Sequence, residues 1–327
     1  MSGAIVTTRL AAATPETISA AAATLSAGGL VAMPTETVYG LAANAASDAA
    51  VAGIYAAKGR PSFNPLIAHV FDFDAAREQG VFDPQAEGLA RAFWPGPLTI
   101  VVPAAPGCRV SLTARAGLDT LALRVPAHNV ARALIEAAGT PLAAPSANRS
   151  GRVSPTTAMH VLADFDGRID WILDAGPSRH GLESTIVACV DSAPRLLRPG
   201  AIPREALEQA LGEPISFDDS SPAAPTAPGQ LRSHYAPRAA LRLDATGAAP
   251  DEAALDFAGQ LAESPAVFRI DLSPDGDLVA AAARLFAALR ELDASGVARI
   301  AAAPVPEMGL GAAINDRLRR AAAPRDQ

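Results

Sequence analysis

The chain has 327 residues, which favours two domains, and half of its residues are apolar, which is enough for a sizeable core. Its formal charge of −7 argues against a protein that coats nucleic acid, because such proteins need a basic face. Cys108 and Cys189 share no metal-ligand spacing, so we expect reduced core thiols. No apolar run reaches the roughly 20 residues of a membrane helix, and the N-terminus has no signal-peptide pattern, so we expect a cytoplasmic protein without a membrane segment.

Short apolar runs alternate with helical patterns in the first two thirds of the chain, which indicates an α/β fold. Strands are predicted at residues 28–35, 66–70, 98–102, 118–125, 170–175 and 184–190. Helices are predicted at residues 47–59, 84–94, 128–138, 154–165 and 204–212. We expect Asp48 to cap the helix at 47–59, and Ser154 to cap the helix at 154–165 with Pro155 at its first position.

A stretch rich in Pro, Ser and Ala, residues 218–239, has no apolar period, and we interpret it as a linker. Beyond it, strands are predicted at 241–245, 266–272 and 297–304, and helices at 275–296 and 311–322. We therefore divide the chain into a first domain (1–215), a proline-rich linker (216–238) and a small C-terminal domain (239–327). Because the linker carries Arg232, His234 and Tyr235 together, we interpret it as a lid over a ligand site, with a plain tether as the alternative.

Lys58 is the only lysine among the 27 basic Lys and Arg residues, and it lies in KGRPSFNP (58–65) together with Arg60. A lysine in the last turn of a helix stabilises that end by about 0.3–1 kcal/mol, but arginine would do so equally well. The compact ammonium of a lysine beside the planar guanidinium of an arginine suits the oxygens of a polyphosphate. This cluster therefore favours a phosphate site.

Other polar clusters also adjoin predicted strands, where α/β enzymes place ligands. PTETVYG (34–40) is either a turn with a helix cap or the wall of a ligand site. APSANRSGRVSPT (144–156) places Ser146 and Asn148 on one side of an extended segment, next to a helix N-terminus that can bind an anion. An ordinary turn with a cap is the alternative for this second cluster.

Two arginines also stand out against apolar surroundings. Arg124 lies inside the apolar run LALRVP, so it either extends to solvent at a sheet edge or faces a carboxylate in a pocket. Arg198 ends the apolar run before PGAI, and Ser184 and Thr185 begin the strand at 184–190.

In this order, the clusters resemble the YrdC family of threonylcarbamoyl-AMP synthases over roughly residues 15–212. The resemblance is carried by GGLVAMPTETVYGLAANA, KGRPSFNPLIAHV, FWPGPLTIVV, LALRVPAH, PLAAPSANRSGRVSPTTA, LDAGPSRHGLESTIVA and LLRPGAI. HYAP (234–237) and GLGAAINDRLRRAA (309–322) resemble the family's longer, two-domain form. The fold implied is α/β: a YrdC-like open, twisted sheet with a concave pocket, followed by a small Rossmann-like domain.

The resemblance implies an enzyme that makes threonylcarbamoyl-AMP, pyrophosphate and water from L-threonine, bicarbonate or CO2, and ATP. The product would pass to a transferase that makes threonylcarbamoyladenosine in tRNA, and the enzyme itself needs no stable contact with nucleic acid. Mg²⁺ would be carried on the ATP phosphates, because the sequence has no convincing carboxylate cage for it.

The resemblance also assigns roles to positions that match the family's motifs. Lys58 and Arg60 are expected to be catalytic, and no general base stands out. The residues expected to bind ATP are Lys58, Arg60, Ser62, Thr120, Ser146, Asn148, Ser154, Arg198 and Tyr235. Those expected to bind threonine are Thr35, His69, Arg124 and Ser184. For His69, a histidine packed in a strand is the alternative, and Arg124 is expected to pair with the threonine carboxylate.

Two other functions stay open at this point. One is a non-catalytic module of the same fold that binds a nucleotide or RNA, although aromatic residues make up only 5% of the chain and few are available for stacking. The other is a carbamoyl-transfer relative that shares the pocket but uses another amine or acyl donor.

Overall fold

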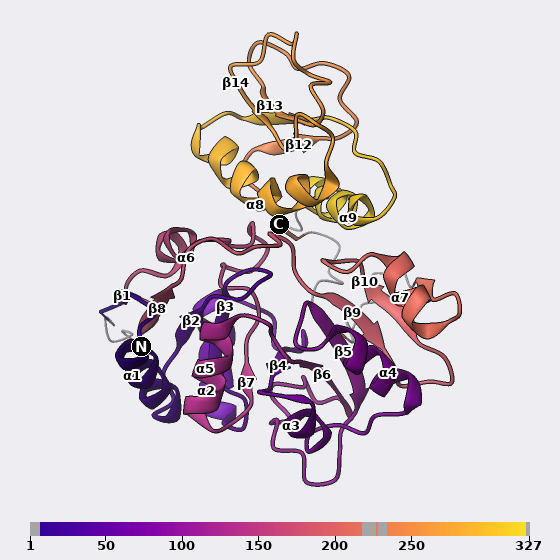
Figure 1. The fold of residues 1–327 in the computed structure, drawn as a ribbon. Helices are drawn as coiled ribbons and strands as arrows, with labels where there is room; N and C mark the ends of the chain where they lie inside the picture. The colour runs from indigo at the N-terminus through magenta and orange to yellow at the C-terminus, as the bar shows by residue number, and fades with distance from the viewer. Residues whose placement is uncertain (1–6, 218–226, 228–233, 325–327) are drawn as a thin grey trace.

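The structure, a computed structural model, describes residues 7–217, 227 and 234–324. Within these ranges, helices and strands alternate and form two sheets, each accompanied by helices (Figure 1). The fold is therefore α/β, with a large twisted open sheet followed by a small Rossmann-like unit, as the sequence predicts. None of the helices in these ranges has the length and apolar character needed to cross a membrane.

The larger sheet has the strand order β1-β8-β2-β3-β7-β4-β6-β5-β9-β10-β11 among the described residues, and it mixes parallel with antiparallel pairs. Its strands are β1 (Arg9–Ala12), β2 (Val31–Met33), β3 (Gly40–Asn44), β4 (Ile67–His69), β5 (Leu98–Pro103), β6 (Thr120–Arg124), β7 (Leu142–Ala143), β8 (Trp171–Asp174), β9 (Thr185–Ala188), β10 (Arg195–Arg198) and β11 (Ser216–Phe217). Strand β11 pairs with β10, so this sheet extends two residues into the segment predicted as linker.

Seven helices accompany this sheet in the described ranges. They are α1 (Pro15–Ser26), α2 (Asp48–Lys58), α3 (Phe73–Arg77), α4 (Pro84–Phe93), α5 (Asn129–Ala138), α6 (Ala158–Phe165) and α7 (Arg204–Leu211). The prediction that Asp48 caps α2 is wrong, because the side chain of Ser47 accepts the hydrogen bond from Ala50 N. Gly59 ends α2 with φ 61°, a left-handed conformation that glycine adopts readily.

The predicted start of α6 is also wrong. Thr157 is the N-cap, and its side chain accepts from His160 N, so the helix begins three residues after Pro155. Ser154 instead donates its hydroxyl hydrogen bond to Glu183, 2.5 Å away. A helix N-terminus at Ser154 is therefore not available to bind an anion.

The C-terminal unit has a parallel sheet of order β12-β15-β13-β14 among its described residues. Its elements are β12 (Ala240–Arg242), β13 (Ala253–Asp256), β14 (Phe268–Asp271), α8 (Leu278–Ala294), β15 (Arg299–Ala302) and α9 (Leu310–Ala322). In Figure 1, α8 and α9 lie on the side of this sheet that faces the larger domain.

The two units share one core where they meet. Val38, Val153 and Leu182 lie in loops of the first unit, yet they belong to the same buried apolar cluster as Leu285 and Phe286 of α8. Residue 181 shows how closely the loops approach this helix: a Cβ added to Gly181 would lie 2.3 Å from Ala283 O. The loops are therefore fixed against the C-terminal unit.

The division into residues 1–215, 216–238 and 239–327 stays a prediction. Residues 218–226 and 228–233 lie outside the described residues, and with them most of the segment that we interpret as a lid. His234 and Tyr235 are described, and both are buried.

Candidate active site

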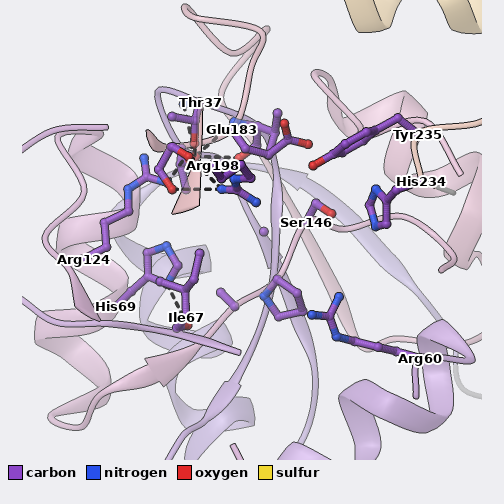
Figure 2. A pocket seen from close by; sticks show the side chains of 16 residues that line it. Thr37, Arg60, Ile67, His69, Arg124, Ser146, Glu183, Arg198, His234 and Tyr235 are labelled. Atoms are coloured by element: carbon purple, nitrogen blue, oxygen red, sulfur yellow. Dashed lines mark hydrogen bonds between the residues drawn. The ribbon is translucent and has the colours of Figure 1, made fainter. Parts of the chain in front are cut away.

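A cavity opens where loops of the larger sheet meet the segment that leads into the C-terminal unit (Figure 2). The space inside it, counted together with the part open to solvent, is about 530 Å³. Figure 2 shows Arg124 and His69 at one end, with Arg60, His234 and Tyr235 at the other. The remaining lining residues are Thr35, Thr37, Val38, Gly40, Ile67, Ala144, Pro145, Ser146, Glu183, Ser184 and Arg198.

Arg124, the last residue of β6, forms one corner of the cavity and is buried. Its Nη2 pairs with Glu36 Oε1 at 2.5 Å, its Nη1 donates to Thr37 Oγ1 at 2.9 Å, and its Nε donates to Gly96 O. The sequence left two interpretations of Arg124, extension to solvent or pairing with a carboxylate in a pocket. The structure shows the second, and the carboxylate belongs to Glu36 of the same chain. Burial acts to raise the pKa of Glu36, but the charge of Arg124, its hydrogen bond and backbone hydrogen bonds together lower that pKa below its ordinary value.

His69 lies beside Arg124, because parallel strands β4 and β6 pair these two residues in register. It is buried as well as lining the cavity, and its Nδ1 is 3.3 Å from Ile67 O. Burial, and secondly the positive charge of Arg124, lower the pKa of His69 to about 3. The imidazole is therefore neutral near pH 7.

Thr35, next to Thr37 at this end, and Ser184, which bonds to Arg198, add small hydroxyl groups to the cavity. Thr35 Oγ1 donates to Val38 O at 2.6 Å and lies 2.8 Å from Thr37 Oγ1. Ser184, which directly precedes β9, has its Oγ 2.7 Å from Thr99 Oγ1 of β5. The corner thus combines an arginine, a carboxylate and hydroxyls, which are groups that recognise the polar parts of an amino acid.

Lys58 is buried behind the cavity wall at the end of α2. Its Nζ donates to the carbonyl oxygens of Ser146 and Asn148, each at 2.5 Å. Burial, and then the charge of Arg60, lower the pKa of Lys58 well below its ordinary value. The lysine therefore fixes the loop that carries Ser146, and a compact ammonium fits between two carbonyls where a planar guanidinium would not.

Arg60 and Arg198 give the rest of the cavity a positive charge: Arg60 lies at the end with His234 and Tyr235, and Arg198 lies in the middle, next to Ser184 (Figure 2). Both are buried, and burial lowers the pKa of each, to about 10 for Arg60. Arg60 donates to Asn64 Oδ1 at 2.6 Å, and Arg198 donates to Ser184 O at 2.8 Å. Both arginines line the cavity, so the stretch of wall from Arg198 to Arg60 is suited to an anion.

His234 and Tyr235 close the cavity from the segment that leads to β12. Tyr235 has φ 63°, an uncommon conformation for a residue other than glycine, and its ring stacks on Phe286 of α8 at 5.5 Å. Burial raises the pKa of Tyr235, whereas burial together with the cations Arg60 and Lys58 lowers the pKa of His234. Both side chains are thus neutral near pH 7.

Several buried polar atoms around the cavity have no hydrogen-bond partner within the described part of the chain. They are Glu36 Oε2, Asn148 Oδ1, His234 Nδ1 and Tyr235 Oη. Buried polar atoms are rarely left unpaired in native proteins, so His234 Nδ1 and Tyr235 Oη, whose residues line the cavity, are available to a ligand or to water.

Some of the residues predicted for the site line this cavity and others do not. Those in the lining are Thr35, Arg60, His69, Arg124, Ser146, Ser184, Arg198 and Tyr235. Those that are not among the lining residues are Lys58, Ser62, Thr120, Asn148 and Ser154. The amide nitrogen of Asn148 donates to two carbonyls of its own loop, Ser62 is exposed, and Thr120 lies at the opposite end of β6 from Arg124.

The sequence assigned no role to two polar residues of the site: Glu183 lines the cavity, and Glu36 pairs with Arg124. Thr37 and His234 also line it, and the sequence indicated them only as members of PTETVYG and of the predicted lid. Their motifs, PTETVYG, GLEST and HYAP, were recognised, but the motifs alone do not indicate which side chains face inward.

Within the ranges 7–217, 227 and 234–324, no group of three or more His, Cys, Asp or Glu side chains is placed to hold a metal ion. The carboxylates nearest the cavity, Glu36 and Glu183, are both paired with arginines. Neither is therefore an uncommitted ligand for a divalent cation.

Two family models match the chain. One, described as "Telomere recombination", matches residues 23–200, and one described as "Threonylcarbamoyl-AMP synthase, C-terminal domain" matches residues 202–323. The threonylcarbamoyl-AMP synthase of Pyrococcus abyssi is 43% identical, with 93% of each chain covered. That of Bacillus subtilis is 42% identical, with 97% of this chain and 96% of the relative covered.

Solved structures give the same result. The crystal structure of P. abyssi Sua5 complexed with L-threonine has a TM-score of 0.87 and 39% identity, and the match covers 98% of both chains. A variant of that protein, with a histidine and a tyrosine replaced by alanine, has a TM-score of 0.88 at 37% identity, with 97% and 96% covered. These likenesses define a two-domain α/β enzyme of the nucleotidyltransferase type. The chain belongs to the threonylcarbamoyl-AMP synthase family.

Proposed function

We propose that this chain joins L-threonine, bicarbonate or CO2, and ATP into threonylcarbamoyl-AMP, with release of pyrophosphate, and of water when bicarbonate supplies the carbon. The observation that carries the proposal is one cavity with two chemically different ends. The end around Arg124 suits an amino acid, and the rest of the cavity, from Arg198 in the middle to Arg60 at the far end, suits a polyphosphate. Family membership supports the same reaction.

The amine of threonine first takes up CO2 as a carbamate, and an oxygen of the carbamate then attacks the α-phosphorus of ATP. A new P–O bond forms, the bond to the β-phosphate breaks, and pyrophosphate leaves with its electron pair. Because negative charge gathers on the phosphates, positioning and cationic stabilisation carry most of the catalysis. We assign the stabilisation to Arg60 and Arg198, which line the cavity, and to Lys58, which holds the loop of Ser146 behind its wall.

We assign threonine to the corner of Thr35, His69, Arg124 and Ser184. Glu36 already occupies one side of Arg124, so a bound carboxylate would share this guanidinium or displace Glu36 from it. The neutral His69 and the two hydroxyls can bond to the threonine side chain and amine.

The remaining ATP contacts are assigned to Ser62, Thr120, Ser146, Asn148, Ser154 and Tyr235. Ser146 and Tyr235 have direct support, since both line the cavity and Tyr235 Oη lacks a partner. Mg²⁺ would enter with ATP as part of the substrate, because the cavity's own carboxylates are paired with arginines.

The product is a reactive mixed anhydride, and we propose that a tRNA-modifying transferase in the cytoplasm consumes it. The net charge of −7 agrees with an enzyme that passes on a small molecule without binding tRNA stably.

The test is pyrophosphate release by the full chain with ATP, bicarbonate and each of threonine, serine and alanine. Release should require bicarbonate and threonine, and serine should be about 10- to 200-fold poorer, because it leaves the volume of one methyl group unfilled. Binding of ATP without turnover would favour a non-catalytic nucleotide- or RNA-binding module. Equal rates with all three amino acids would favour a carbamoyl-transfer relative.

A further inference from the structure

Arg317, on helix α9 of the C-terminal unit, is fully buried against the first unit. Its Nε donates to Glu183 Oε2 at 2.9 Å, and its Nη1 donates to Pro199 O at 2.8 Å. Its guanidinium carbon lies 5.1 Å from the ring centroid of Tyr235. Each of these contacts reaches a residue on or next to the wall of the cavity, so α9 is in contact with the site.

Glu183 is the residue through which this contact reaches the cavity. It lines the cavity, and its Oε1 accepts the hydroxyl hydrogen bond of Ser154 while its Oε2 accepts from Arg317. Both oxygens of the carboxylate are therefore held by the protein, and Glu183 links Ser154 to α9.

The charge of Glu183 requires a counterion. A buried carboxylate beside a site for triphosphate repels the ligand unless a cation cancels its charge at short range. Arg317 supplies that cation. Asp316 orients Arg317 through a bond of 2.6 Å to its Nη1, and Arg320 in turn bonds to the other oxygen of Asp316 at 2.9 Å.

We propose that Arg317 is a positioning residue for ATP: it holds Glu183 and Ser154 in place and cancels the charge of Glu183. By this inference, which rests on the proposed ATP-dependent function, the C-terminal domain completes the nucleotide side of the cavity.

The experiment compares Arg317→Gln with Arg319→Gln in the full chain. Arg319 is two residues further along the same helix, is exposed, and pairs with Glu307, away from the cavity. Arg317→Gln should raise the KM for ATP on the order of tenfold, since it leaves one uncompensated charge near the phosphates. The KM for threonine should stay near the wild-type value, and Arg319→Gln should change neither.

A second variant separates positioning from folding. In Glu183→Gln/Arg317→Gln the uncompensated charge is absent, so ATP affinity should recover in part relative to Arg317→Gln alone. Recovery supports the inference. An unchanged KM for ATP in Arg317→Gln, equal rises in both KM values, or a double variant no better than the single one would each overturn it.

Calorimetric titration with ATP keeps this test distinct from that of the proposed function. If the wild-type chain binds ATP but releases no pyrophosphate with threonine, the proposed function fails, while the ATP affinities of the variants still decide the role of Arg317. If Arg317→Gln does not fold, Arg317→Lys replaces it, because it keeps the charge but loses the two-directional bonding to Glu183 and Pro199. Weaker ATP binding by Arg317→Lys supports the inference, and wild-type binding overturns it.

Discussion

Lys58→Arg tests why the only lysine of the chain lies at the end of α2. The lysine side chain is 3% exposed, and its Nζ holds two carbonyl oxygens at 2.5 Å each. A guanidinium is larger and planar, so it must either push the loop of Ser146 outward or lose at least one of these bonds. Forcing extra atoms into a packed site also costs about 1–3 kcal/mol of folding stability.

The expected loss of activity in Lys58→Arg follows from the hydrogen bonds of Lys58 Nζ to the two carbonyl oxygens. A hydrogen bond to a charged group contributes about 1.5–3 kcal/mol, so a misplaced bond lowers kcat/KM for ATP by roughly 10- to 150-fold. Pyrophosphate release at varied ATP concentration measures this loss, and thermal unfolding shows whether the fold persists. The matched control is Arg91→Lys, which makes the reverse exchange in the last turn of α4, where the side chain is 71% exposed. Near-wild-type kcat/KM in Lys58→Arg would refute the reasoning and leave Lys58 as an ordinary cation at a helix end.

Three further predictions concern other residues of the cavity. Arg124→Ala should raise the KM for threonine much more than that for ATP, and calorimetry showing unchanged threonine binding would assign Arg124 to structure alone. Because the pKa of His69 is about 3 in the folded protein and near 6.5 in the unfolded chain, the unfolded state binds more protons between these values. His69 should therefore lower stability by up to about 1.4 kcal/mol for each pH unit below 6.5. His69→Gln should reduce the slope of stability against pH by that amount in denaturant unfolding measured from pH 7 to pH 5, while His160 and His234, whose pKa values burial also lowers, keep their own contributions. Tyr235→Phe removes a buried hydroxyl that lacks a partner, so it should not lower the unfolding temperature but should weaken ATP binding; a lower unfolding temperature with unchanged ATP binding would contradict this.

Strands β4, β6 and β9, which carry His69 and Arg124 or begin beside Ser184, could be predicted because their apolar runs are bounded by polar turns, whereas β3 and β10 were not predicted. Arg124 stood out for the same reason, since a charge within an apolar strand needs a buried partner. The prediction that Ser154 caps α6 is wrong because two residues of similar capping ability lie three positions apart. Thr157 caps the helix, and the hydroxyl of Ser154 donates to Glu183 instead. Helix α1 was not predicted, because a run of alanines has no hydrophobic period to detect.

Contacts between distant segments were beyond the reach of sequence spacing. Glu183 and Arg317 lie 134 residues apart, and Arg124 and Glu36 lie 88 apart. Each pair depends on how separate elements pack, so a single sequence identifies the residue types but not the partners.

The apolar cluster that joins Val38, Val153 and Leu182 to the C-terminal unit has a consequence for cooperativity. Unfolding either unit alone would expose part of the core of the other, so the two should melt in one transition rather than two. A shortened chain that ends before β12 would present these three side chains to water beside the mouth of the cavity. Converting them to polar residues is therefore the first step in designing a one-domain version of this enzyme, and their apolar character makes the second domain part of a single folding unit.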